Sequence, residues 1–340
     1  MSTVPQRYSV GVVGLGKYIP ERVIGNAEVE ERTGLPPGTV EKRTGIRTRH
    51  IVTPEESASS MSLAAARAAL GDARVSAEEL GLILACTFSA DYVMPALACK
   101  VHQGLGAKNA GAFDIMANCT AFQVGASLAS DRLRCDPSLR YSLVLGTAVV
   151  SRYLNWYDAD TSIYFGDGAG AAVLGPVPDG FGFLAHEVFS VTAAYESVRL
   201  RGGGSSYPLR AENIHEHAPY LEMNGMDVWK QVLQHQPRVI RQALAKANLA
   251  LEDVDFFIFH QANRHLIDYF MGKLRLPREK TYTNVERLGN TAEASIPIAL
   301  CEAAEQGLIK HNDIVVMSGV GAGFTFGASV MRWYQPTGDA

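Results

Sequence analysis

The sequence of 340 residues has few cysteines, and they form no pattern that would hold a disulfide framework or a metal ion. None lies in a CxxC or Cys/His metal spacing, and an odd number in so long a chain is not typical of a disulfide-stapled secreted domain. We therefore expect neither disulfides nor structural zinc. The five cysteines are Cys86, Cys99, Cys119, Cys135 and Cys301.

Long apolar runs and a strong net charge are also missing. The N-terminal apolar stretch is broken by Lys17 and is too short for a secretory or transmembrane segment, and no later stretch approaches about 20 apolar residues. The formal net charge is −4 and the pI is about 6.2, so no global positive field attracts nucleic acid or an anionic membrane. We expect a soluble, cytoplasmic protein.

The chain reads as two copies of one plan. At an offset of 174 residues, segment 69–86 matches segment 243–260 at several identical positions, and each reads as a helix, an acidic turn and an apolar strand. Alternating helices and strands of this kind predict layered α/β halves with buried sheets. Gly and Pro cluster near residues 175–180, so we place the halves at 1–178 and 179–340.

Cys119 is the first candidate for chemistry. It stands where a β-rich run gives way to a helical stretch of small residues, which places its thiol at a helix N-terminus. The helix dipole and free N–H groups stabilise a thiolate there and lower the thiol pKa from about 8.5. A lone cysteine in such a segment is more often a small buried hydrophobe, so the interpretation depends on its partners.

His260 and Asn290 are the candidate partners. His260 ends the apolar strand DFFIF, at the strand edge where α/β proteins place their sites, although a structural histidine is the simpler alternative. Asn290 precedes a helix of small residues and could be only its N-cap. At an offset of 171, Asn290 pairs with Cys119. The repeat thus puts all three at strand ends or helix starts, where they could line one cavity.

Several segments, in order and spacing, resemble the ketoacyl-acyl-carrier-protein synthase III family, nearly from end to end. They are RTGIRTRH (43–50), the Cys119 segment, FGDGAGAAVLGP (165–176), HQAN (260–263), GNTAEASIP (289–297) and GAGFTFG (321–327). The resemblance implies a duplicated, five-layered α/β/α/β/α thiolase fold and a homodimer. It also implies a catalytic triad of Cys119, His260 and Asn290.

The resemblance further implies a ping-pong condensation that needs no metal or cofactor. Cys119 would take an acyl group from a thioester, and the oxyanion would be held by the backbone N–H groups of Cys119 and Ala322. His260 and Asn290 would then stabilise the enolate formed as a malonyl-type thioester loses carbon dioxide. Attack of this carbanion on the acyl-cysteine gives a 3-oxoacyl product, for fatty acid or specialised polyketide metabolism.

Other positions depart from the family. By alignment, Thr39 and Ala159 replace a Trp and an Arg that clamp the adenine of coenzyme A, which removes contacts worth roughly 1 kcal/mol or more each. Met226 replaces a pantetheine-contacting Asn, and Val320 replaces a Phe of the decarboxylation pocket. The full set of expected substrate-binding residues is Arg43, Met94, Met226, Asn263 and Val320, with flexible Met94 shaping the acyl pocket of the partner subunit.

Basic residues gather in and after the helix that begins near residue 263. An acidic acyl carrier protein would be attracted to such a surface, although a solvated helix face gives the same pattern. Acyl carrier protein, acyl coenzyme A thioesters, or both are thus the expected partners. The expected docking residues are Lys230, Arg264, Lys273 and Arg275.

Three other functions fit parts of the sequence. An acyltransferase of the same fold would pass the acyl group of Cys119 to a hydroxyl or amine, with His260 as general base and without decarboxylation. A nicotinamide dehydrogenase is suggested by GVVGLG (11–16), but Ile19 replaces the third glycine of that fingerprint. A non-catalytic subunit is disfavoured because all three triad residues are present.

Overall fold

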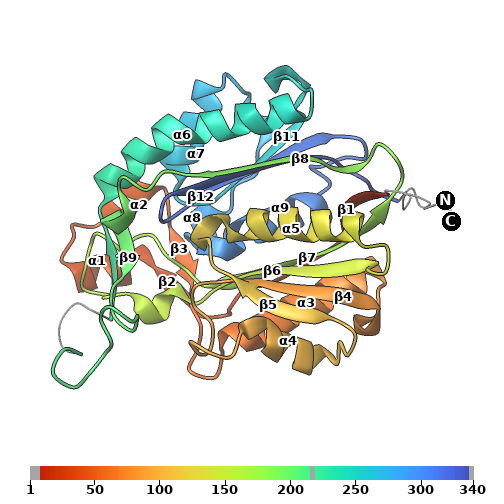
Figure 1. Ribbon diagram of the computed structural model, residues 1–340. Coiled ribbons are helices and arrows are strands. Elements are labelled where there is room, and N and C mark those ends of the chain that lie inside the picture. Colours follow the sequence, from red (N-terminus) through yellow and green to blue (C-terminus); the bar gives the residue numbers. More distant parts are fainter. Residues whose placement is uncertain (1–7, 215–218, 337–340) are drawn as a thin grey trace.

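The computed structural model describes residues 8–214 and 219–336, and its core is built on two main sheets (Figure 1). The first sheet contains, in spatial order, β1 (Ser9–Tyr18), β7 (Gly168–Val177), β6 (Tyr141–Ala148), β4 (Leu80–Cys86) and β5 (Gly111–Ile115). The second contains β11 (Phe256–Phe259), β12 (Ile314–Gly321), β13 (Thr325–Arg332) and β8 (Gly182–Ser190). Two small sheets pair β2 (Val23–Gly25) with β3 (Thr48–His50), and β9 (Val198–Leu200) with β10 (Leu221–Met223).

Helices cover both outer faces of the sheets and fill the space between them. The α-helices are α1 (Asn26–Thr33), α2 (Thr39–Thr44), α3 (Ala58–Ala73), α4 (Leu97–Leu105), α5 (Ala121–Cys135), α6 (Gly225–Lys246), α7 (Arg264–Lys273), α8 (Val285–Leu288) and α9 (Ser295–Glu305). Short 3₁₀ turns are η1 (Ala77–Glu79), η2 (Asn118–Thr120), η3 (Val150–Tyr153), η4 (Tyr195–Ser197), η5 (Leu251–Asp253), η6 (Arg278–Lys280) and η7 (Ala292–Ala294).

The elements stack in five layers. Helices α5 and α9 lie between the two sheets, with α3 and α4 under the first sheet and α6 and α7 over the second (Figure 1). Three apolar cores correspond to these contacts: one between the sheets, one between α3, α4 and the first sheet, and one between α6, α7 and the second. Each central helix is therefore buried among apolar residues of both sheets, and the predicted five-layered fold is confirmed.

The pairing pattern of the first sheet recurs in the second. β1 pairs antiparallel with β7, β7 antiparallel with β6, and β6 parallel with β4. In the same order, β8 pairs antiparallel with β13, β13 antiparallel with β12, and β12 parallel with β11. The expected boundary at 178/179 falls in the turn between β7 and β8. The division of the chain at that point stays a prediction.

The GVVGLG segment is a strand that packs closely on a helix. It belongs to β1, which lies against α3. A Cβ atom added at Gly16 would lie 2.3 Å from the carbonyl oxygen of Ala65, so only glycine lets the strand approach the helix this closely. Helix packing therefore accounts for the glycine that had suggested a dinucleotide site.

No helix in residues 8–214 and 219–336 is long and apolar enough to cross a membrane. Over the same residues, no group of three His, Cys, Asp or Glu side chains is arranged to hold a metal ion.

Candidate active site

Cys119 lies in η2, directly before the central helix α5. Its side chain is partly buried and packs against an apolar cluster that includes Val150, Phe165 and Ala292. The cluster also contains the partly buried ring of Phe88, whose centroid lies 5.7 Å from that of Tyr153. The residue is thus partly exposed and lies beside apolar side chains, which suits a nucleophile that carries an apolar acyl group.

The segment that carries Cys119 is joined to the end of β12. Asn118 Nδ2 donates to the carbonyl oxygen of Ala322 over 3.1 Å. A Cβ atom at Gly321 would lie 2.2 Å from the carbonyl oxygen of Ala117, so this contact requires glycine. The structure therefore brings Ala322, the second predicted oxyanion residue, next to the Cys119 segment.

His260 follows β11 immediately, as the sequence predicted. Its backbone N–H donates to the carbonyl oxygen of Ser318, which fixes the residue at the end of the parallel pair β11–β12. Its imidazole Nδ1 lies 2.6 Å from Ser295 Oγ, at the start of α9. Burial lowers the pKa of His260 to about 4, because the apolar surroundings disfavour the charged imidazolium. The imidazole is therefore neutral near pH 7.

Asn290 is held by both its backbone and its side chain. Its N–H donates to the carbonyl oxygen of Tyr164, and its own carbonyl oxygen accepts from Gly166 N–H. Its side-chain Oδ1 accepts from Ala292 N–H over 2.9 Å. Within the described part of the chain, its Nδ2 makes no hydrogen bond. The amide is thus oriented with its donor available to a ligand.

These elements meet in one place. η7 packs against η2, and Ala292 of η7 shares the apolar cluster of Cys119. The chain then runs directly into α9, whose first residue, Ser295, contacts His260. Cys119, His260 and Asn290 are therefore linked through a single short stretch, residues 290–295, although they come from distant parts of the sequence.

The ionisation of Cys119 differs from the sequence-based expectation. Burial raises the pKa of the Cys119 thiol, and the negative charge of Glu293 adds to the increase. The thiol's own backbone N–H acts in the opposite direction but is the weakest of the three causes. The predicted lowering of the Cys119 pKa by the helix start is therefore wrong, because the surroundings favour the protonated thiol. The thiol proton must leave as the nucleophile reacts.

The residues expected to bind substrate are spread over several elements. Met94 and Met226 are 81% and 83% exposed, respectively, whereas Val320 is buried at the end of β12. Asn263 caps α7, because its Oδ1 accepts from Leu266 N–H over 2.9 Å. Arg43 is exposed in the last turn of α2. Their roles in substrate binding stay predictions.

The expected docking residues fall into two groups. Lys230, Lys273 and Arg275 are exposed. Arg264 instead forms ion pairs with Asp268 and Glu286, which leaves less of its charge for a partner. A helix-face pattern in the sequence could not reveal this, because Glu286 belongs to another helix, α8.

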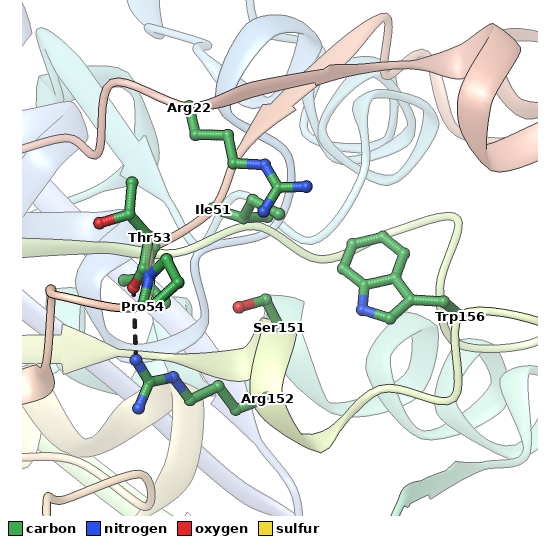
Figure 2. Close-up of a pocket in the computed structure, with 8 residues that line it drawn as sticks. Arg22, Ile51, Thr53, Pro54, Ser151, Arg152 and Trp156 are labelled. Atoms are coloured by element: carbon green, nitrogen blue, oxygen red, sulfur yellow. Dashed lines mark hydrogen bonds between the residues drawn. The ribbon is translucent and has the colours of Figure 1, made fainter.

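A cavity that the sequence did not suggest opens on the surface beside the β2–β3 sheet (Figure 2). It has a volume of about 440 Å³, and Cys119 does not line it. The side chains of Arg22, Arg152 and Trp156 surround it, and Arg152 donates to the carbonyl oxygen of Thr53. The predicted site residues lie elsewhere, so the cavity is separate from the triad.

The comparisons with known proteins agree with this architecture. A family model described as 3-oxoacyl-[acyl-carrier-protein (ACP)] synthase III matches residues 113–191, and its C-terminal counterpart matches residues 244–333. A β-ketoacyl-[acyl-carrier-protein] synthase III of Desulfitobacterium hafniense is 41% identical over 96% of this chain and 98% of the relative. The corresponding protein of Symbiobacterium thermophilum is 38% identical over 95% of this chain and 98% of the relative.

Solved structures give the same result. The 3-oxoacyl-[acyl-carrier-protein] synthase III of Aquifex aeolicus has a TM-score of 0.88 at 33% identity, covering 96% of this chain and 100% of that one. The priming β-ketosynthase of the R1128 polyketide biosynthetic pathway has a TM-score of 0.89 at 31% identity, covering 98% and 99%.

A five-layered α/β/α/β/α arrangement with a cysteine at the start of a central helix defines a thiolase-fold enzyme. The chain belongs to the β-ketoacyl-[acyl-carrier-protein] synthase III family. It is accordingly a condensing enzyme that transfers acyl groups, as the sequence resemblance implied.

Proposed function

We propose that the enzyme transfers an acyl group to Cys119 and then joins it to a malonyl-type thioester with loss of carbon dioxide. The observation that carries this proposal is that the thiol of Cys119 and the neutral side chains of His260 and Asn290 all adjoin the short stretch 290–295. Neutral His260 and the available Nδ2 of Asn290 can each donate a hydrogen bond to one carbonyl oxygen. Two such donors suit an enolate, which needs stabilisation of a developing negative charge.

In the first half-reaction, Cys119 Sγ attacks the carbonyl carbon of an acyl thioester. A bond forms between Sγ and that carbon, and the carbon–sulfur bond of the donor breaks. The thiol proton passes to the departing thiolate. Backbone N–H groups of Cys119 and Ala322 hold the intermediate oxyanion, and the hydrogen bond between Asn118 and Ala322 supports their proximity.

In the second half-reaction, a malonyl-type thioester enters beside acyl-Cys119. Its carboxylate leaves as carbon dioxide, and the electron pair moves into the thioester enolate, whose oxygen accepts from His260 and Asn290. The enolate carbon then attacks the acyl carbon. The bond from that carbon to Sγ breaks, and the Cys119 thiolate takes a proton from solvent water as the 3-oxoacyl product leaves.

Acyl carrier protein is the proposed acyl donor, used in preference to coenzyme A. Thr39 and Ala159 offer no aromatic ring or guanidinium to an adenine, whereas exposed Lys273 and Arg275 offer positive charge to an acidic partner. The extender unit and the acyl chain stay open. The cytoplasmic location of the protein stays a prediction.

A second copy of the chain is the proposed subunit partner. Strand β5 is at the edge of the first sheet, so its outer backbone groups can pair with another strand. Large apolar side chains are exposed on it and on nearby loops, where a second copy would bury them. They are Tyr92, Val93, Met94, Phe113 and Met116. Analytical ultracentrifugation should give the dimer mass, and Phe113→Asp should lower it to the monomer mass.

Carbon dioxide release tests the reaction type. Purified enzyme with an acyl thioester and radiolabelled malonyl thioester should release labelled carbon dioxide in a one-to-one ratio with 3-oxoacyl product. Cys119→Ala should form no acyl-enzyme and no condensation product. Acyl transfer to a hydroxyl or amine without carbon dioxide release would identify the acyltransferase alternative instead.

A further inference from the structure

Glu293 is a fully buried carboxyl group beside the candidate nucleophile. It lies in η7 with 0% of its surface exposed. Its Oε1 accepts from the backbone N–H of Phe88 over 2.9 Å, whereas its Oε2 has no hydrogen-bond partner among the described residues. No ion pair within this part of the chain neutralises it. Buried carboxyl groups without such compensation are rare, because removing a charge from water is costly.

The position of Glu293 couples it to Cys119. η7 packs against η2, and the preceding residue, Ala292, shares the apolar cluster of Cys119. The negative charge of Glu293 acts on two thiols, those of Cys119 in η2 and of Cys86 at the end of β4. Cys86 is fully buried and so closed to substrates. The accessible thiol that Glu293 affects is therefore Cys119.

The elements packed against η7 carry further ionisable groups, and none of them forms an ion pair with Glu293 within the described residues. β7, also packed against η7, contains no ionisable side chain. Burial lowers the pKa of His260, whereas Lys17, Glu305 and Glu302 act on the Cys301 thiol. The further ionisable residues on elements that contact η7 are Tyr141 of β6, Asp131, Arg132, Arg134 and Cys135 of α5, and Cys301, Glu302 and Glu305 of α9.

Two acids in one apolar region interact strongly. Charges of the same sign repel each other far more in a dry interior than in water, so loss of a proton from one group opposes loss from the other. Such a pair titrates as a unit, and its first negative charge is shared between the two sites in a ratio that does not depend on pH. Burial raises the pKa of Glu293 to about 8, so this charge first forms mainly on the carboxyl group.

We propose that Glu293 is a positioning residue for the nucleophile, because its carboxyl group and the Cys119 thiol share a single negative charge. Glu293 thereby limits the thiolate content of Cys119 in alkaline solution. The proposal rests on the proposed function in taking Cys119 as the residue that is acylated.

The pH profile of Cys119 alkylation measures this coupling directly. Wild type and Glu293→Gln are treated with iodoacetamide between pH 6 and pH 9, and the rate at Cys119 is followed by peptide mass mapping. Gln keeps the oxygen that accepts from Phe88 but cannot ionise. Both proteins should react equally at pH 6, where Glu293 is neutral. At pH 9 the variant should react about tenfold faster, because no carboxylate competes with the thiolate.

Glu305→Gln serves as the matched control, because Glu305 is exposed on α9 and acts on Cys301 instead. Its alkylation profile at Cys119 should match that of the wild type. A constant rate ratio between Glu293→Gln and wild type at all pH values would indicate a merely structural role and overturn the proposal. Thermal unfolding at pH 6 verifies that the variant is folded.

The acyl-enzyme mass separates this proposal from the proposed function. The expected result is a tenfold alkylation ratio together with an acyl group on wild-type Cys119. If wild-type Cys119 takes an acyl group but the alkylation ratio stays constant, the coupling is wrong and the proposed function stands. If the ratio rises with pH but no thioester acylates Cys119, the coupling stands and the proposed function fails.

Discussion

The imidazole Nδ1 of His260 and the hydroxyl Oγ of Ser295 lie 2.6 Å apart, across the junction of β11 and α9. Ser295 Oγ also accepts from the backbone N–H of Gln261 over 3.4 Å, so its own hydrogen is free to point at Nδ1. Donation from Oγ to Nδ1 places the proton of neutral His260 on Nε2, as the proposed mechanism requires. That tautomer is the one that can donate to an enolate oxygen.

Replacing Ser295 should affect the condensation step and leave acylation unchanged. Ser295→Ala removes the hydrogen bond that selects the tautomer of His260, at a cost of about 1 kcal/mol, or about fivefold in the condensation rate. Ser295→Thr keeps the hydroxyl and should restore most of the rate. Rapid-quench measurement of each half-reaction tests this. An equal loss in both half-reactions would instead indicate general damage to the site.

Asn290 should be needed only after acylation. Asn290→Ala removes one donor to the enolate oxygen, and loss of such a donor typically lowers the rate by about a hundredfold or more. The acyl-enzyme should still form at nearly the normal rate, because no enolate takes part in that step. Intact mass measures acylation, and labelled carbon dioxide measures condensation. An unchanged rate of carbon dioxide release would remove Asn290 from the mechanism.

Cys119 should be the cysteine that an acyl thioester modifies. Cys86 and Cys301 are buried, and exposed Cys99 and Cys135 lie outside the apolar cluster beside Cys119. Peptide mapping after incubation with a panel of acyl thioesters tests this. The Cys99→Ser and Cys135→Ser variants are the controls and should be acylated normally. An adduct on another cysteine, with Cys119 unmodified, would contradict the assignment.

Glu293 should make the folded protein less stable as the pH rises. Its pKa is about 8 in the folded protein, above the ordinary 4.5, so between these values the folded state keeps a proton that the unfolded chain has lost. Stability from this group is therefore lost as the pH rises through that window. Relative to wild type, Glu293→Gln should gain unfolding free energy with pH, by at most about 1.4 kcal/mol per pH unit. Urea unfolding at four pH values measures this, and parallel stability curves would contradict it.

The exposed cations Lys273, at the end of α7, and Arg275, just after it, should favour a carrier-protein donor. Lys273→Glu should lower kcat/KM for acyl carrier protein thioesters about threefold at low salt, and leave coenzyme A thioesters unaffected. The difference should shrink as salt screens the surface charges. Lys310→Glu is the matched control, because Lys310 is exposed in the turn between α9 and β12. An equal loss of kcat/KM with carrier-protein and coenzyme A thioesters would show that Lys273 does not act through carrier docking.

Much of the architecture could be predicted from the order of residues along the chain. The helix, turn and strand repeated in 69–86 and 243–260 are local features, since hydrophobic period and turn residues depend on near neighbours. Both segments contain the expected helix end and strand, and His260 follows its strand directly. The positions of Cys119 before a helix and of His260 after a strand could be predicted for the same reason.

The charge states of the site depended on contacts between residues far apart in the chain. Phe88 and Glu293 are separated by 205 positions, yet the backbone of one holds the carboxyl group of the other. The sequence pattern predicted that Arg264 is a free cation, but in the structure it forms an ion pair with Glu286 of α8. Burial, which raises the pKa of Cys119 and lowers that of His260, is a property of the assembled layers. Electrostatic energies depend on distance and local dielectric, and both arise only when the two sheets and their central helices come together.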